Sequence, residues 1–98
     1  MAYGIVFEFT DEVGKKHYDA VNDKLGLDMA GGTGPWPAGL RSHAGGTTPG
    51  GFFVYEVWDS KAQQEQWMAD RLGPALAEIG VPAPVRVVEL DLVGFAAP

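Results

Sequence analysis

At 98 residues, of which 46% are hydrophobic and 20% charged, the chain has the composition of a globular protein and the length of one domain, residues 1–98. It has no cysteine, which excludes disulfides and thiolate metal sites. A net charge of −6 argues against nucleic-acid binding, because few basic side chains are present to neutralise phosphates. Its apolar runs are far shorter than a membrane span and the N-terminus lacks a basic leader, so we expect a cytoplasmic protein with no membrane segment.

The first quarter of the chain predicts a strand followed by a helix. Apolar side chains alternate over Tyr3–Phe9, as in a strand with one buried face. Residues 10–12 (Thr-Asp-Glu) offer a cap and acidic groups for the start of a helix. Apolar residues then recur near helical spacing, namely Val13, Tyr18, Val21 and Leu25, and Gly26 suits a left-handed helix end.

The middle of the chain predicts a loop and a hairpin. Leu27–Gly39 is rich in Gly and Pro and has no periodicity, so we expect a long loop. Leu40–Thr48 is predicted as a strand in which Gly45 and Gly46 form a bulge. A turn at residues 49–51 leads into the strongest strand, about 51–58, where aromatic and β-branched residues dominate.

The last part predicts a helix, a break and a final strand. Ser60 is positioned to cap a helix, with Gln63 at the spacing of a capping box. Gly73-Pro74 is expected to interrupt this helix, and a short piece to Ile79 would continue at an angle. Residues 85–93 then predict the last strand, followed by a tail at 94–98.

Strand–helix–strand followed by strand–helix–strand is the order of an α+β, ferredoxin-like βαββαβ domain with one antiparallel four-stranded sheet. We expect the first and third strands to be central and two helices to cover one face only. Strand parity predicts that the helix-covered face carries one apolar set: Ile5, Phe7, Phe9, Val88, Leu90 and Leu92. Glu56 shares a face of its strand with Phe52, Val54 and Trp58, but parity does not decide whether this is the face of the sheet that carries Glu8. It also does not decide on which face Arg41 and His43 lie. An apolar uncovered face predicts a homodimer in which a second copy packs on it.

Residues 53–62, FVYEVWDSKA, together with the length and element order, resemble the antibiotic biosynthesis monooxygenase-like proteins of the dimeric α/β barrel superfamily. The resemblance implies paired sheets and a small-molecule pocket between each sheet and its helices or loops. Members of that superfamily include cofactor-free oxygenases of polyketide phenols, quinol oxygenases, haem-degrading enzymes and lactone isomerases, and for this chain we expect no cofactor. Many relatives carry a histidine in the second helix, where this chain has none. This departure argues against a haem-ligand or helix-histidine mechanism.

The residues point to two candidate proton acceptors. His43 is a strand-borne imidazole that can act as a base near neutral pH, or that makes only a structural hydrogen bond. Glu56 lies among aromatic residues, where it either accepts a proton or forms an ion pair with Arg41 or Arg86. His17 is expected on the solvated face of its helix, and the two histidines and scattered carboxylates form no metal motif.

Five further residues are candidates for contacting a small aromatic or hydrophobic ligand: Trp36, Tyr55, Trp58, Trp67 and Arg41. Trp36 lies between two prolines in the long loop, where it either closes a pocket as a lid or fixes the loop to the body. A tryptophan at the position of Trp67 is more often part of the helix core than a ligand contact.

These observations lead to three hypotheses. The first is a cofactor-independent monooxygenase, or a related isomerase or cyclase, that uses a base in an apolar pocket on an aromatic or polyketide-like substrate. The second is a non-catalytic protein that binds a hydrophobic ligand in the same pocket. The third is a purely structural dimer.

Overall fold

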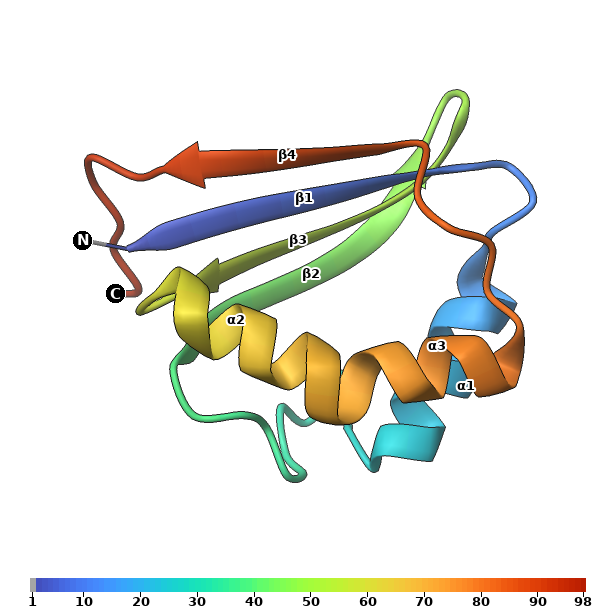
Figure 1. The fold of residues 1–98 in the computed structure, drawn as a ribbon, viewed down its shortest axis with the longest axis horizontal. Helices are drawn as coiled ribbons and strands as arrows, with labels where there is room; N and C mark the ends of the chain where they lie inside the picture. The colour runs from blue at the N-terminus through green and yellow to red at the C-terminus, as the bar shows by residue number, and fades with distance from the viewer. Residues whose placement is uncertain (1) are drawn as a thin grey trace.

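The computed structural model describes residues 2–98 as an antiparallel sheet with helices packed on one face (Figure 1). In chain order the elements are β1 (Tyr3–Thr10), α1 (Lys15–Leu25), β2 (Leu40–Thr48), β3 (Gly51–Trp58), α2 (Lys61–Trp67), the π-helical segment η1 (Met68–Leu72), α3 (Gly73–Ile79) and β4 (Arg86–Asp91). The strand order is β2-β3-β1-β4, so the first and third strands are central. The predicted ferredoxin-like α+β fold is confirmed.

The start of α1 differs from the prediction. The helix begins at Lys15 after an extended Gly14, and the predicted cap at residues 10–12 is wrong. Thr10 instead closes a turn, because its carbonyl oxygen accepts a hydrogen bond of 3.1 Å from the Val13 N–H. The helix ends as predicted at Gly26, whose φ of 75° is left-handed.

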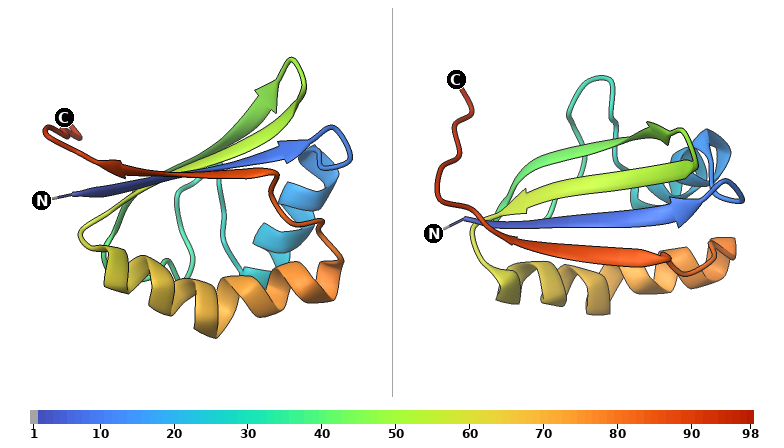
Figure 2. Two further views of the ribbon diagram at one scale, coloured as in Figure 1. Left: turned by 45° about the horizontal axis from the view of Figure 1, so that its top comes forward. Right: turned by 90° about the horizontal axis from the view of Figure 1, so that it is seen from above.

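The second helix begins as the sequence predicts, because the Gln63 N–H donates to Oγ of Ser60 at 3.3 Å. It does not break at Gly73-Pro74, where a break was predicted. The chain passes through η1, in which the Gly73 N–H donates to the Met68 carbonyl five residues earlier. This wider turn admits Pro74, which has no N–H to donate, and α2, η1 and α3 run on as one long helix (Figures 1 and 2).

The predicted bulge at Gly45-Gly46 is also wrong. Both glycines pair regularly with β3, and the register shifts instead between Leu40 and Ser42. Gly45 has a packing role, since a Cβ there would lie 2.5 Å from Cε1 of Tyr18. The missing side chain lets the Tyr18 ring lie close to the sheet.

The strand register corrects the predicted grouping of side chains. Ile5 lies opposite Glu56 and Phe7 opposite Val54, so Glu56 is on the helix-covered face and not on the face of Glu8. On β4, however, Val88 lies opposite Val6. Val88 and Leu90 are therefore on the face away from the helices, whereas the prediction put them with Ile5 and Phe7. The helix-side positions of β4 lie at the sheet edge, where Val87 remains 48% exposed.

Figure 2 shows the sheet and the helices as two layers, and the core side chains lie between them. Its buried members come from β1, β3 and the helices: Ile5, Phe7, Val21, Leu25, Leu27, Trp58, Trp67 and Ala75. The uncovered face carries a second apolar set in which each side chain is half-buried: Val6, Phe53, Tyr55, Val88 and Leu90. The apolar residues that first suggested a face needing cover, Phe52, Val54 and Trp58, lie under the helices instead. Among residues 2–98 there is no helix with the length and apolar character needed to cross a membrane.

Candidate functional site

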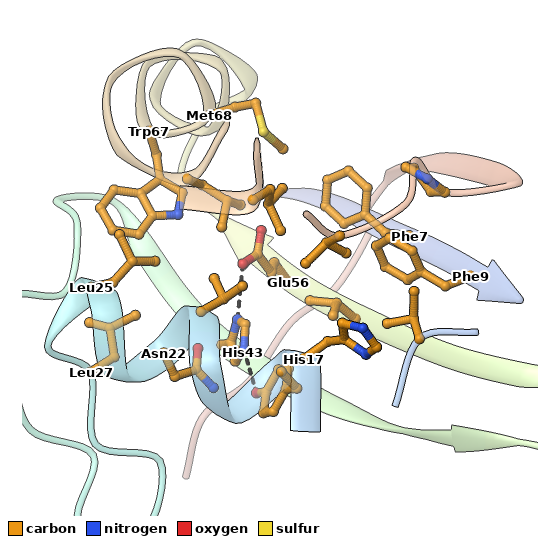
Figure 3. Close-up of a pocket in the computed structure, with 18 of the residues that line it drawn as sticks. Phe7, Phe9, His17, Asn22, Leu25, Leu27, His43, Glu56, Trp67 and Met68 are labelled. Atoms are coloured by element: carbon orange, nitrogen blue, oxygen red, sulfur yellow. Dashed lines mark hydrogen bonds and ion pairs between the residues drawn. The ribbon is translucent and has the colours of Figure 1, made fainter. Parts of the chain in front are cut away.

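A cavity of about 200 Å³ lies between the helix-covered face of the sheet and the helices (Figure 3). β1 and β3 contribute Phe7, Phe9, Phe52 and Val54, and the helices contribute Val21, Leu25, Trp67, Met68, Leu72 and Leu76. Its wall is almost wholly apolar. For scale, an engineered apolar cavity of about 150 Å³ takes up benzene. The space therefore suits one small aromatic or hydrophobic molecule.

Three polar side chains form a hydrogen-bonded chain in the wall of this cavity (Figure 3). Nδ1 of His43 lies 2.9 Å from Oε2 of Glu56. Nε2 of His43 lies 2.6 Å from the hydroxyl of Tyr18. Because a carboxylate only accepts, Nδ1 carries a hydrogen, and the Nε2 of a neutral imidazole accepts from the Tyr18 hydroxyl. We call this hydrogen-bonded chain, Glu56–His43–Tyr18, the relay, because its carboxylate, imidazole and phenol are all groups that can exchange protons.

The sheet fixes the inner end of the relay. His43 and Glu56 occupy directly opposite positions on β2 and β3, which brings their side chains together on one face. The Glu56 side chain is 2% exposed and that of His43 is 12% exposed. The second carboxylate oxygen of Glu56 accepts a hydrogen bond of 3.2 Å from Nε1 of Trp58. Both oxygens of this buried carboxylate are thus satisfied.

The outer end of the relay comes from α1. The Tyr18 ring stacks on the His43 ring with centroids 5.7 Å apart and packs against Phe52 at 5.4 Å. Burial, and secondarily the negative charges of Glu56 and Asp19, raise the pKa of the Tyr18 phenol, with Asn22 opposing the rise. Tyr18 therefore keeps its proton at neutral pH and is suited to pass protons rather than to hold a negative charge.

The long loop contributes one aromatic residue to the site, Trp36. It lines the cavity, and its ring centroid lies 5.6 Å from that of His43. Its Nε1 is buried and finds no hydrogen-bond acceptor in the protein. Asn22, on α1, lines the same cavity beside Tyr18; its Nδ2 is buried, and its side chain is the group whose hydrogen bond opposes the rise in the pKa of Tyr18.

The cavity brings together four of the seven residues singled out from the sequence: Trp36, His43, Glu56 and Trp67. Trp58 lies behind them in the core as the hydrogen-bond donor to Glu56. Tyr55 and Arg41 lie elsewhere. Tyr55 is opposite Val6 on the uncovered face, and Arg41 is exposed in an ion pair of 2.8 Å with Asp59.

The proposed ion pair of Glu56 with an arginine is wrong, because both candidate arginines have other partners. Arg41 pairs with Asp59, and Arg86 lies 3.6 Å from Glu8. His17 was predicted on the solvated face of α1, yet it lines the cavity and accepts a hydrogen bond of 3.3 Å from the Gly14 N–H through Nδ1. Within the part of the chain that the structure describes, no three histidine or acidic side chains gather as metal ligands.

Sequence reasoning missed Tyr18 and Asn22 as site residues. Tyr18 was assigned to the apolar stripe of the first helix, and Asn22 was not noticed. Their spacing in the sequence could have shown it. Residues four apart in a helix lie on the same face, and the face with Tyr18 and Asn22 also carries the apolar residues Val21 and Leu25. A polar group on a buried helix face needs a partner or a function.

The fold and the cavity define the class: a ferredoxin-like α+β protein with a small-molecule-sized space between its sheet and helices. No protein-family model matches the chain, and no curated protein is significantly similar to it. Among solved structures, it is similar to a candidate antibiotic biosynthesis monooxygenase from Chloroflexus aurantiacus, with a TM-score of 0.66 and 18% identity over 99% of this chain and 98% of that one.

Two other solved structures share the fold. A dimeric ferredoxin-like protein of unknown function from Thermobifida fusca has a TM-score of 0.51 and 19% identity, covering 91% of this chain and 86% of that one. A hydroxynitrile lyase from Passiflora edulis has a TM-score of 0.52 and 17% identity, covering 99% of this chain and 96% of that one. The resemblance to antibiotic biosynthesis monooxygenase-like proteins is therefore confirmed at the level of the fold. Sequence identities this low do not assign an activity to the chain. The three neighbours are themselves described differently, as a monooxygenase, a protein of unknown function and a hydroxynitrile lyase.

Proposed function

We propose that the protein is an enzyme that removes a proton from a small aromatic or polyketide-like molecule and lets the resulting anion react with oxygen without a cofactor. The observation that carries this proposal is the hydrogen-bonded chain Glu56–His43–Tyr18 in the wall of an almost wholly apolar cavity. A base placed in such a cavity can act on a substrate from which water is excluded.

The relay supplies the base in one concerted movement. The Tyr18 oxygen takes the proton of the substrate while the Tyr18 hydroxyl hydrogen moves to Nε2 of His43, 2.6 Å away. The imidazolium that forms remains next to the buried carboxylate of Glu56, which offsets its charge. Because burial raises the pKa of Tyr18, the negative charge resides on the substrate and not on the phenol.

Oxygen chemistry without a cofactor needs an electron-rich substrate anion, since the substrate itself must supply the electrons that reduce O₂. O₂ adds to a ring carbon of the anion as a peroxide, and the C–H hydrogen at that carbon is lost as the O–O bond breaks. One oxygen atom stays in the product as a C=O group, and the other leaves as water with this hydrogen and the proton first removed by the base. Trp36, over His43, would shield the anion from solvent. The similarity in fold to the Chloroflexus aurantiacus protein supports this choice of chemistry.

The test is a panel of hydroquinones and polycyclic phenols in buffer equilibrated with ¹⁸O₂, followed by oxygen uptake and product mass. We expect labelled product from the wild type and at least about 100-fold less from His43→Gln, the range over which general bases act. Tight binding of panel members with no uptake and no new product would reject the enzyme in favour of the alternative, a non-catalytic hydrophobic-ligand-binding protein.

We also infer a homodimer in which two copies pair their uncovered sheet faces. The half-buried apolar set Val6, Phe53, Tyr55, Val88 and Leu90 supports this pairing. The dimeric Thermobifida fusca neighbour of the same fold supports it as well. The cavity is on the other face of the sheet, so each subunit would keep its own site.

A further inference from the structure

We propose that Met29 is an oxidation site that switches the relay off: a peroxide converts its thioether to a sulfoxide, which competes with His43 for the hydrogen of the Tyr18 hydroxyl group. The inference rests on the proposed function, because the relay is what the oxidation switches. It adds a modification site in the long loop and the class of reagent that acts there, which is hydrogen peroxide or an organic hydroperoxide.

The first step of the argument is the contact between the long loop and the relay. Sδ of Met29 lies 3.3 Å from the Tyr18 hydroxyl, the same group that lies 2.6 Å from Nε2 of His43. A phenol has one hydrogen to donate, and a thioether sulfur is a weak acceptor. While Met29 is reduced, the hydrogen therefore remains directed at the imidazole, as proton transfer along the relay requires.

The second step is the tight turn that holds Met29 in this position. Asp28, the preceding residue, donates its N–H to the Thr33 carbonyl at 2.9 Å and accepts from the Gly32 N–H at 2.8 Å. Its carboxylate accepts a hydrogen bond of 3.1 Å from the Ala30 N–H, on the other side of Met29. Because the backbone is held on both sides, the Met29 side chain is kept beside Tyr18.

The third step is the access of an oxidant to the sulfur-bearing side chain. Met29 is 37% exposed, whereas Met68 is less exposed and lies in the wall of the cavity. A thioether in contact with solvent is oxidised by peroxides to a sulfoxide. The sulfur donates an electron pair to one peroxide oxygen and the O–O bond breaks. The other oxygen takes up the hydrogen of the transferred one and leaves as water, or as an alcohol from a hydroperoxide.

The fourth step is the effect of the new oxygen on Tyr18. Oxidation makes the side chain polar, and the sulfoxide oxygen is bonded to the atom that already lies 3.3 Å from the phenol. The flexible methionine side chain lets this oxygen accept the Tyr18 hydrogen, so that Nε2 of His43 loses its donor. Tyr18 then cannot pass its hydrogen to His43 as it takes a proton from the substrate. Methionine sulfoxide reductases reverse the oxidation, so the switch is reversible.

The test follows the ring nitrogens of His43 by ¹⁵N NMR before and after treatment with hydrogen peroxide, with peptide mass spectrometry to locate each added oxygen. In the wild type we expect one oxygen on Met29 and a downfield shift of Nε2, as for an imidazole nitrogen that loses its donor, while Nδ1 keeps its hydrogen. Met29→Leu, which keeps the apolar bulk without the sulfur, should show no shift after peroxide. Met68→Leu is the matched control and should respond as the wild type does.

The rate of proton removal is the second measurement. Peroxide should lower it at least about 10-fold in the wild type and less than about 2-fold in Met29→Leu, and a methionine sulfoxide reductase should restore it. Three results would overturn the proposal: Met29 left unoxidised where Met68 is oxidised, an unmoved Nε2 resonance in protein oxidised at Met29, or the same shift in peroxide-treated Met29→Leu. The NMR measurement involves no turnover, so it tests the switch even if the oxygenation test fails. Failure of the switch in turn leaves the base and its oxygen chemistry unaffected.

Discussion

Nδ1 of His43 lies 2.9 Å from Oε2 of Glu56, and the two residues occupy directly opposite positions on β2 and β3. This pairing places a buried carboxylate behind an imidazole that faces a cavity. It also determines the tautomer of His43, because Glu56 can only accept at Nδ1.

Glu56→Gln should reverse that tautomer. Because Nε1 of Trp58 donates to one oxygen of Glu56, the glutamine oxygen should accept from Trp58 and leave the amide NH₂ to donate to Nδ1 of His43. The hydrogen of the imidazole then lies on Nε2, which no longer accepts from Tyr18. We expect ¹⁵N NMR to show His43 changing from the Nδ1–H to the Nε2–H form, and kcat to fall about 100-fold or more. Glu8→Gln, a carboxylate on the other face of the sheet, is the control and should change neither.

The stability of the fold should fall as the pH rises above about 10 because of Tyr18 and Tyr3. Burial raises the pKa of both phenols above the ordinary value of 10.0, and a hydrogen bond to Glu89 adds to the rise at Tyr3. Unfolded tyrosines lose their protons near that value while these two retain theirs. The unfolded state then binds fewer protons, and the free energy of unfolding decreases with pH. Urea unfolding from pH 8 to 11 should show a shallower decline in Tyr18→Phe, and an identical decline would refute this assignment.

Gly45→Ala should separate Tyr18 from His43. The new Cβ would lie 2.5 Å from Cε1 of Tyr18, so the ring must move away from the sheet. We expect a loss of about 1–3 kcal/mol in the free energy of unfolding, typical of overpacking. The rate of proton removal should fall as well, because the Tyr18 hydroxyl would no longer lie next to Nε2 of His43. Gly50→Ala, where an added Cβ meets no atom within 4 Å, should stay within about 0.5 kcal/mol of wild type, and a similar loss in both variants would contradict the packing argument.

Tyr55→Glu should dissociate the inferred dimer. It places a charge in the centre of the uncovered face, opposite Val6, without touching the cavity on the other side of the sheet. We expect sedimentation to show a dimer dissociation constant raised at least about 30-fold. Ala69→Glu adds the same charge at an exposed position of the long helix and should leave the dimer intact. A monomeric wild type at micromolar concentration would refute the pairing.

The fold could be predicted because its signals are local. Ser60 and Gly26 mark helix ends through side-chain and backbone geometry that depends only on neighbouring residues. Element order then limits the topology to very few arrangements. The break predicted at Gly73-Pro74 failed because a π-helical turn accommodates a proline inside a helix, and no local signal announces such a turn.

The site could be predicted only in part, because it depends on register. His43, Glu56, Trp36 and Trp67 were recognised by residue type and surroundings. Which face Glu56 occupies follows from its pairing with Ile5, and a shift of one residue would reverse it. Tyr18 and Asn22 belong to the site through the packing of α1 on Gly45, a contact between segments distant in the sequence.

The most direct measurement of proton removal in the cavity is hydrogen–deuterium exchange of 2-tetralone in D₂O, followed by NMR under nitrogen. Exchange reports loss of the proton itself, whatever happens to the anion afterwards. We expect the wild type to accelerate exchange beside the carbonyl with saturation in 2-tetralone. His43→Gln should still bind the ketone but lose at least about 100-fold of this rate. Wild-type protein saturated with 2-tetralone and showing no accelerated exchange, or equal rates in the two proteins, would contradict the account.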